Sequence, residues 1–163
     1  MSRPSTRATW TAYLLSLLLG LVLQIVQLPE SLAAARPLLP AMLLAYWALR
    51  EPQLPMLLPA FLIGLLMDVL LGTPMGQHAI GLLVLIYLVV SLRSFFIVFP
   101  LWQATLALIP AWVIYCFLMY WIDGATHHTA DRWLRWLPAL STSLSWPLLW
   151  SVMELIRQPG EEE

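Results

Sequence analysis

Long apolar runs, almost free of charged side chains, occupy most of this chain and limit what it can fold into. Hydrophobic residues make up 61% of the chain and charged residues 10%, against about 45–50% and about 25% in soluble domains. A water-soluble fold could not cover so much apolar surface, whereas a bilayer accepts helices of about 20 mostly apolar residues. The sequence therefore predicts an all-α integral membrane protein, a six-transmembrane-helix bundle forming one domain over residues 1–163. The predicted spans are residues 10–28, 36–50, 54–72, 78–92, 98–122 and 137–156.

The first apolar run raises the alternative of a cleaved signal peptide, because Ala33–Ala35 could mimic a signal-peptidase site. The run at residues 10–28 has 19 residues, however, and the apolar core of a signal peptide has about 7–15. We therefore expect a retained membrane helix. Inside the predicted spans, prolines at positions 59, 110 and 147 each lack a backbone N–H and predict kinked helices.

The arginines predict which ends of the spans face the cytoplasm, since cytoplasmic loops carry an excess of Lys and Arg. This rule places both termini in the cytoplasm. The inner side then holds Arg3, Arg7, Arg50, Arg93 and Arg157, and the outer side holds Arg36, Arg132 and Arg135. Six tryptophans fall near span ends, which is typical of an interfacial aromatic belt rather than a cofactor wall. They are Trp10, Trp47, Trp121, Trp133, Trp136 and Trp150.

The chain lacks the sequence patterns of the common catalytic and cofactor sites. It contains no GxxxxGK[ST] phosphate loop, no HExxH and no GxSxG. A net charge of −1 provides no basic surface for nucleic acid. His127 and His128 are adjacent and would not face the same way on a helix, so we expect surface histidines, not a metal site. Cys116 lies in an apolar run and is expected to be buried and inert. No catalytic residue, cofactor or metal is predicted.

Asp68 is the most informative residue, because an ionisable side chain inside a span costs several kcal/mol and is a functional candidate. Three interpretations stay open. The carboxylate could reach interfacial water one turn from Gly72, form a structural hydrogen bond, or take part in transport or ligand binding.

Spacing relates Asp68 to a stripe of small residues. Ala60, Gly64, Asp68 and Gly72 recur every four residues and share one helix face. A similar stripe of Ala12, Ser16, Gly20 and Gln24 lies on the first span. Since small residues let helices approach closely, we predict that spans one and three pack together with Gln24 near Asp68. Such spacing also arises by chance in apolar helices. Near the C-terminus, Glu154 and Arg157 are predicted to form an ion pair at the inner surface.

Several of these features together resemble the MreD family of bacterial rod shape-determining membrane proteins. The length and the six-span plan match the family, as does Arg36-Pro37 opening the second span, followed by an apolar run that ends in Tyr46-Trp47. The most specific match is Gly64–Gly76, GLLMDVLLGTPMG, which resembles the family's stretch at the end of the third span. The loop carrying the two histidines matches no family motif.

The resemblance implies a non-catalytic scaffold of the elongation machinery in the bacterial inner membrane. MreD proteins associate with the single-span protein MreC. Through it they associate with the actin-like MreB, the glycosyltransferase RodA and a penicillin-binding transpeptidase in lateral peptidoglycan synthesis. The family also resembles the substrate-binding subunits of energy-coupling-factor vitamin transporters in fold. A subunit of that type is the alternative function. It would require polar residues such as Asp68, Gln77 and His78 to converge on an outward-facing cavity.

Overall fold

The computed structural model describes residues 6–26, 29, 33, 35–96, 99–125 and 134–157, of which residues 6–8, 135 and 157 are described by their backbone alone. This part of the chain is entirely helical and contains no strand, so the predicted all-helical fold is confirmed for it. Six α-helices and one turn of 3-10 helix, η1, follow each other along the described chain. They are α1 (Thr6–Ile25), α3 (Leu39–Arg50), α4 (Leu57–Leu71), α5 (Gln77–Phe96), α6 (Leu101–Ala125), η1 (Leu134–Trp136) and α7 (Leu137–Arg157).

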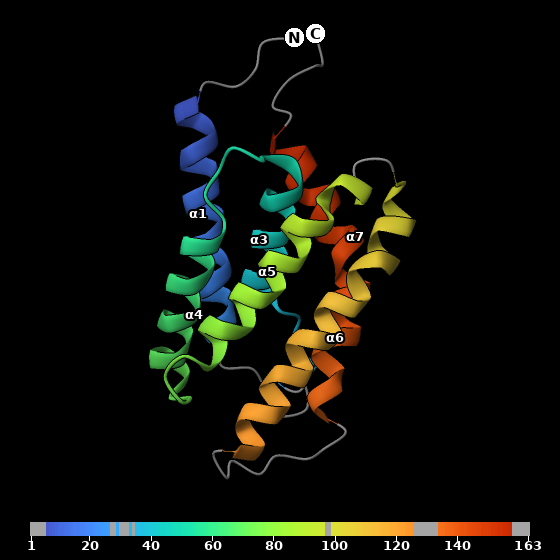
Figure 1. Ribbon diagram of the computed structural model, residues 1–163. Helices are drawn as coiled ribbons and strands as arrows, with labels where there is room; N and C mark the ends of the chain where they lie inside the picture. Colours follow the sequence, from blue (N-terminus) through green and yellow to red (C-terminus); the bar gives the residue numbers. More distant parts are fainter. Residues whose placement is uncertain are drawn as a thin grey trace, which may run out of the picture.

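Successive helices run in opposite directions along the long axis of the bundle (Figure 1). The first turn of α1, the last turn of α7 and the connection from α3 to α4 lie at one end, which we call the terminal end. The turn between α4 and α5 lies at the opposite end, which we call the turn end. Residues at the start of α1 and the end of α7 thus share one end of the bundle.

Helix α3 is the centre of the bundle. It contacts α1, α4, α5 and α7, and every residue from Pro40 to Leu49 is buried. With 12 residues it is about 18 Å long, which is shorter than the hydrocarbon core of a bilayer at about 30 Å. A helix this short is compatible with a membrane because its neighbours, rather than lipid, surround it. The most extensive helix contact in the described chain joins α4 to α5 across the turn end.

Large apolar side chains cover the outside of the bundle, whereas its few buried polar groups lie inside. Leu144, Leu148 and Leu155 of α7 are exposed, and so are Leu15 and Leu19 of α1. The buried polar side chains are Gln24, Asp68, Gln77 and Thr142. By length and composition, α5 and α6 could each cross a bilayer, and residues 9–25 and 57–71 form shorter apolar helices. This distribution is typical of a bundle whose solvent is lipid.

The helix bounds differ by a few residues from the predicted spans, and α5 and α4 show two of the physical reasons. Helix α5 continues four residues past the predicted end at Leu92, because Arg93 is a good helix former and lies in the last turn. Pro59 was expected inside a span but lies in the first turn of α4, where a backbone N–H has no intrahelical partner in any case. Pro110 and Pro147 do lie inside α6 and α7.

Candidate functional site

Asp68 lies one turn before the end of α4, and its carboxylate organises the turn end of the bundle. The side chain accepts four hydrogen bonds. Its Oδ1 accepts from Thr73 Oγ1 at 2.9 Å and from the backbone N of His78 at 2.9 Å, and it lies 2.8 Å from His78 Nδ1. Its Oδ2 accepts from the backbone N of Gly76 at 2.8 Å. The residue is 1% exposed, so the interpretation as an interfacial, water-facing carboxylate is wrong and the structural one fits the geometry.

These contacts join the C-terminus of α4 to the N-terminus of α5. The first N–H groups of a helix have no intrahelical partner and carry a partial positive charge, so a carboxylate there is stabilised. Gly72 and Gly76 both adopt positive φ angles, 67° and 96°, which L residues with a side chain rarely adopt. The two glycines therefore allow the chain to reverse within five residues and bring Gly76 and His78 to Asp68.

The small-residue face of α4 packs mainly against α5, which corrects the predicted pairing along this face: α1 and α4 are in contact, but less extensively than α4 and α5. A Cβ atom added to Gly64 would lie 2.3 Å from Ala79 Cα and 2.5 Å from Ala79 N. Ala60 is also fully buried. Helix α1 instead packs mainly on α3, where Gly20 lies against the Leu43 side chain. A small-residue stripe favours close approach of a second helix, but it does not identify that helix.

Gln24 is likewise used elsewhere than predicted. Its Oε1 accepts from the backbone N of Leu39 at 3.2 Å, and its carbonyl oxygen accepts from Arg36. Arg36 also donates to the carbonyl of Val26 and so caps the end of α1. Thr142 of α7 accepts from the backbone N of Leu38 at 3.0 Å. Among the described residues, Gln24 and Asp68 therefore form no hydrogen bond with each other.

Gln24 and Thr142 supply hydrogen-bond acceptors to the start of α3, a helix that begins inside the bundle, and Arg36 supplies donors to the carbonyls at the end of α1. The segment that contains Pro37 is not helical, and Leu38 is buried, so its backbone N–H groups need partners from neighbouring helices. Sequence reasoning singled out Gln24, Arg36 and Pro37 but missed Thr142. In the sequence, Thr142 is distinguished only by a hydroxyl group within an otherwise ordinary polar stretch of α7.

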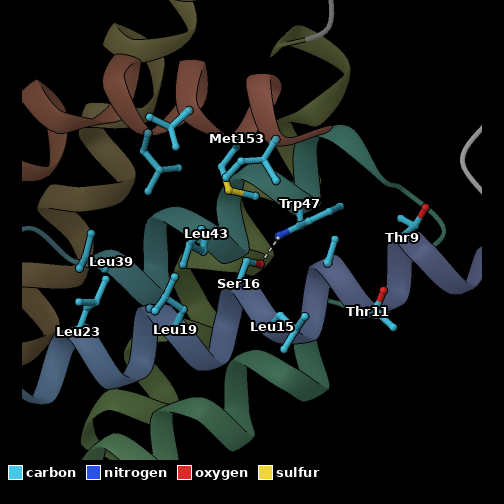
Figure 2. Close-up of a pocket in the computed structure, with 15 residues that line it drawn as sticks. Thr9, Thr11, Leu15, Ser16, Leu19, Leu23, Leu39, Leu43, Trp47 and Met153 are labelled. Carbon is cyan, nitrogen blue, oxygen red and sulfur yellow. Dashed lines mark hydrogen bonds between the residues drawn. The ribbon is translucent and has the colours of Figure 1, made fainter. Parts of the chain in front are cut away.

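The polar residues considered for an outward-facing cavity bond to other side chains instead. His78 binds Asp68, and Gln77 Nε2 donates to Asp123 Oδ1 at 2.8 Å, which ties the start of α5 to the end of α6. A cavity with a volume of about 640 Å³ lies between α1 and α7 (Figure 2). None of Asp68, Gln77 and His78 lines it.

A second polar cluster lies at the terminal end and was mostly missed by sequence reasoning. Glu154 Oε1 lies 2.8 Å from Arg50 Nε and accepts from Tyr46 Oη at 2.8 Å. The Arg50 guanidinium also stacks on Trp150, 4.7 Å from the ring centroid. Glu154 was predicted to pair with Arg157, whose side chain lies outside the described residues. The observed partner is 104 positions away in sequence, so no local pattern identifies it.

Aromatic rings form a continuous series across four helices, from the terminal end to the middle of the bundle. Trp47 was expected in an interfacial belt, but it is buried and its Nε1 donates to Ser16 Oγ at 2.9 Å. Each ring in the series lies 5.2 to 6.0 Å from the next, within the range of favourable aromatic pairs. In order, the series is Trp10, Tyr13, Trp47, Tyr46, Trp150, Trp146 and Trp112.

The described residues contain no group of three His, Cys, Asp or Glu side chains that could hold a metal ion. Cys116 is buried, as expected. His127, His128 and Trp133 lie outside the described residues. Both clusters therefore contain side chains that join helices.

Comparison with known proteins gives a consistent match along the chain. The family model described as "MreD: rod shape-determining protein MreD" matches residues 5–156. A protein of Haemophilus influenzae described as "Rod shape-determining protein MreD" is 26% identical over 149 residues, which cover 91% of this chain and 92% of the relative. No solved structure matches.

Proposed function

Since this chain belongs to the MreD family of rod shape-determining proteins, we propose that it is a non-catalytic membrane scaffold of the bacterial elongation machinery. In this role it binds MreC directly and helps to regulate lateral peptidoglycan synthesis and rod shape. RodA, a penicillin-binding transpeptidase and MreB belong to the same complex. The observation that carries the proposal is the family match over residues 5–156.

The character of the two polar clusters supports a scaffold rather than an enzyme. Each cluster joins helices: Asp68 joins α4 to α5, and Glu154 joins α7 to α3. Catalysis needs a nucleophile, an acid or base, and room for a reacting group beside them. A scaffold needs a rigid bundle with apolar surface left for other membrane helices, and the exposed leucines of α1 and α7 provide such surface.

We place the protein in the inner membrane with six spans and both termini in the cytoplasm. The alternating direction of the helices and the shared end of α1 and α7 support this topology (Figure 1). Arg50 ends α3 and Arg93 lies in the last turn of α5, so both lie at the terminal end, as the excess of arginines in cytoplasmic segments requires. Arg36 precedes α3 at the turn end, which would face outward.

The energy-coupling-factor alternative stays a prediction that no observation in the described residues favours. A vitamin-binding subunit needs polar groups that converge on a cavity. Here Asp68 bonds to His78 and Gln77 bonds to Asp123, and the cavity between α1 and α7 is lined almost entirely by apolar side chains.

Depletion of the protein in its native rod-shaped bacterium tests the scaffold. Cells are expected to widen into spheres as the protein is diluted, because side-wall synthesis loses its organisation, and a plasmid copy is expected to restore rods. Cell length and width measured by microscopy give the readout. Rods of unchanged width after complete depletion would contradict the proposed function.

A further inference from the structure

A small cavity lies at the terminal end of the bundle, where four helices come together. The ends of α3 and α5, the start of α6 and the part of α7 around Trp150 border it (Figure 1). Its volume is about 200 Å³. Arg50 is the one charged side chain among the described residues that line it, and the others are apolar or aromatic. The cavity therefore places a cation beside an apolar wall.

Two neighbours hold the guanidinium of Arg50 in a fixed orientation. Its Nε donates to Glu154 Oε1 at 2.8 Å, and its face lies on the Trp150 ring, 4.7 Å from the centroid. Glu154 Oε1 is itself held by Tyr46 Oη at 2.8 Å. A planar group that is fixed at one edge and on one face loses little further freedom when it binds another partner.

The end of the guanidinium remains available for such a partner. Within the described part of the chain, the Arg50 side chain forms a single hydrogen bond, the one from Nε, so its two Nη groups bond to none of these residues. The side chain is 40% exposed and can be reached from outside. Two Nη groups form a fork that donates parallel hydrogen bonds to two oxygens of one phosphate group.

The cavity lies at the depth of the lipid headgroups. Arg50 is the last residue of α3, and Arg93 lies in the last turn of α5. Arginines at the ends of spans reach the membrane interface. Phe96 and Ala104 form the buried side of the cavity, whereas Phe99 is exposed. Basic pockets between membrane helices bind lipid headgroups. A phospholipid carries its phosphate at this depth with apolar groups beside it, and so matches both parts of the lining.

The start of α6 adds positive polarity to the same place. Leu101 and Ala104, on the first turn of this helix, line the cavity. The N–H of Ala104 bonds to the carbonyl of Pro100 at 3.0 Å, whereas the N–H groups of residues 101–103 precede the first intrahelical bond. These groups carry the positive end of the helix dipole, which reinforces the attraction of Arg50 for an anionic group.

We propose that this cavity binds a glycerophospholipid through its phosphate group, with the Nη groups of Arg50 donating to two phosphate oxygens. Glu154 and Trp150 are positioning residues that orient Arg50, and Phe99 and Leu101 contact the apolar part of the lipid. This site acts on a lipid and needs no protein partner, so it goes beyond the proposed function.

Native mass spectrometry of the full chain, released from mild detergent, tests the site by titration with phosphatidylglycerol. This lipid is the probe because the phosphate is its only charged group. We expect R50Q to bind it about tenfold more weakly than the wild type, equivalent to about 1.4 kcal/mol. R93Q is the matched control, since Arg93 lies at the same end but does not line the cavity, and it should bind as the wild type does. Equal binding by R50Q and the wild type would overturn the proposal.

Two further variants separate phosphate binding from a structural role of the Arg50–Glu154 pair. E154Q keeps an oxygen that can accept from Arg50 but removes the negative charge, so lipid affinity should stay the same or rise. A loss in E154Q as large as that in R50Q would instead indicate a structural role and would overturn the proposal. R50K keeps the charge without the fork and should also weaken binding, which preserves the test if R50Q does not fold.

Two competitors identify the part of the lipid that is recognised. Diacylglycerol, which lacks the phosphate, is expected to bind the wild type much more weakly than phosphatidylglycerol. Inorganic phosphate in excess is expected not to displace phosphatidylglycerol, because the free ion makes no use of the apolar wall. Equal binding of diacylglycerol, or displacement of the lipid by inorganic phosphate, would overturn the assignment of the cavity to a phospholipid.

Discussion

At the scale of the residue, Asp68 shows how an acidic side chain can be buried in an apolar bundle when the neighbouring turn supplies its hydrogen-bond donors. Its two carboxylate oxygens accept from two backbone N–H groups and one hydroxyl, and Oδ1 also contacts the His78 ring. A buried ionised group is tolerated when its hydrogen bonds are satisfied. The donors of the α4–α5 turn therefore replace the water that would otherwise hydrate the carboxylate, and these hydrogen bonds make the turn rigid.

Replacing Asp68 by alanine is expected to destabilise the protein strongly. The backbone N–H groups of Gly76 and His78 would lose their acceptor, at about 1–3 kcal/mol for each buried donor. Thermal aggregation of the detergent-solubilised protein measures the effect. V69A, on the same helix but exposed, is the control and should unfold at nearly the wild-type temperature. Equal stability of D68A and V69A would contradict the structural role.

Two glycines in helices offer a sharper comparison of packing. At Gly64 a methyl group would lie 2.3 Å from the backbone of Ala79, and helices α4 and α5 would have to separate. At Gly124 in α6 the same methyl group meets nothing within 4 Å. We expect G64A to lower the unfolding temperature and G124A to leave or raise it, since alanine is favoured over glycine in helices by about 1 kcal/mol. The opposite order would show that α4 and α5 are not in close contact.

At the scale of the element, α3 depends on its neighbours for its hydrogen bonds as well as its burial. Its first N–H groups bind Thr142 of α7 and Gln24 of α1, and its last turn is held by Glu154 through Tyr46 and Arg50. The Arg50–Glu154 pair is partly exposed, so its net contribution is small, in the range of about 0–1 kcal/mol. The buried contacts at the start of α3 matter more.

Replacing Thr142 by valine tests that start. Valine has nearly the same shape but leaves the backbone N–H of Leu38 without an acceptor, which is expected to cost about 1–3 kcal/mol. The control is T105V in α6, where the lost hydroxyl bonds only to a carbonyl of its own helix. Hydrogen exchange should rise at residues 38–42 in T142V and not in T105V. Unchanged exchange there would mean that α7 does not anchor α3.

The existence of the helices could be predicted from the sequence, but their partners could not. Apolar runs and prolines indicate where helices lie because burial in lipid and backbone geometry are local constraints. Asp68 was found because an acidic residue in a span is unusual. Its connection to Gly76 and His78, by contrast, depends on the path of the chain through the turn. The pairing of Glu154 with Arg50 depends on the whole bundle, so no periodic pattern reports it.

At the scale of the whole molecule, the distribution of apolar side chains requires lipid around the bundle. Exposed leucines and buried polar groups reverse the arrangement of a soluble protein. A charge placed on the outside therefore has a cost that depends on depth, about 2.5–3.5 kcal/mol at the centre of a span and much less near its end, where an arginine reaches the interface. On the surface of a soluble protein, a charge at either position along the helix would change stability little.

Two arginine substitutions on α7 exploit this difference. Leu148 lies near the middle of the helix and is 69% exposed, whereas Leu155 lies near its end and is 75% exposed. We expect L148R to reduce the amount of protein in the membrane fraction several-fold and L155R to leave it nearly unchanged. Immunoblots of carbonate-washed membranes measure the amounts. Equal recovery of both variants would contradict a lipid-facing α7.

Purifying the tagged native protein in mild detergent and identifying its companions by mass spectrometry tests whether it is a scaffold of the wall-synthesis machinery. We expect MreC to be enriched in proportion to the tagged chain, together with RodA and a penicillin-binding transpeptidase. Recovery of paired cytoplasmic ATPases without MreC would contradict it and would identify the protein as a transporter subunit.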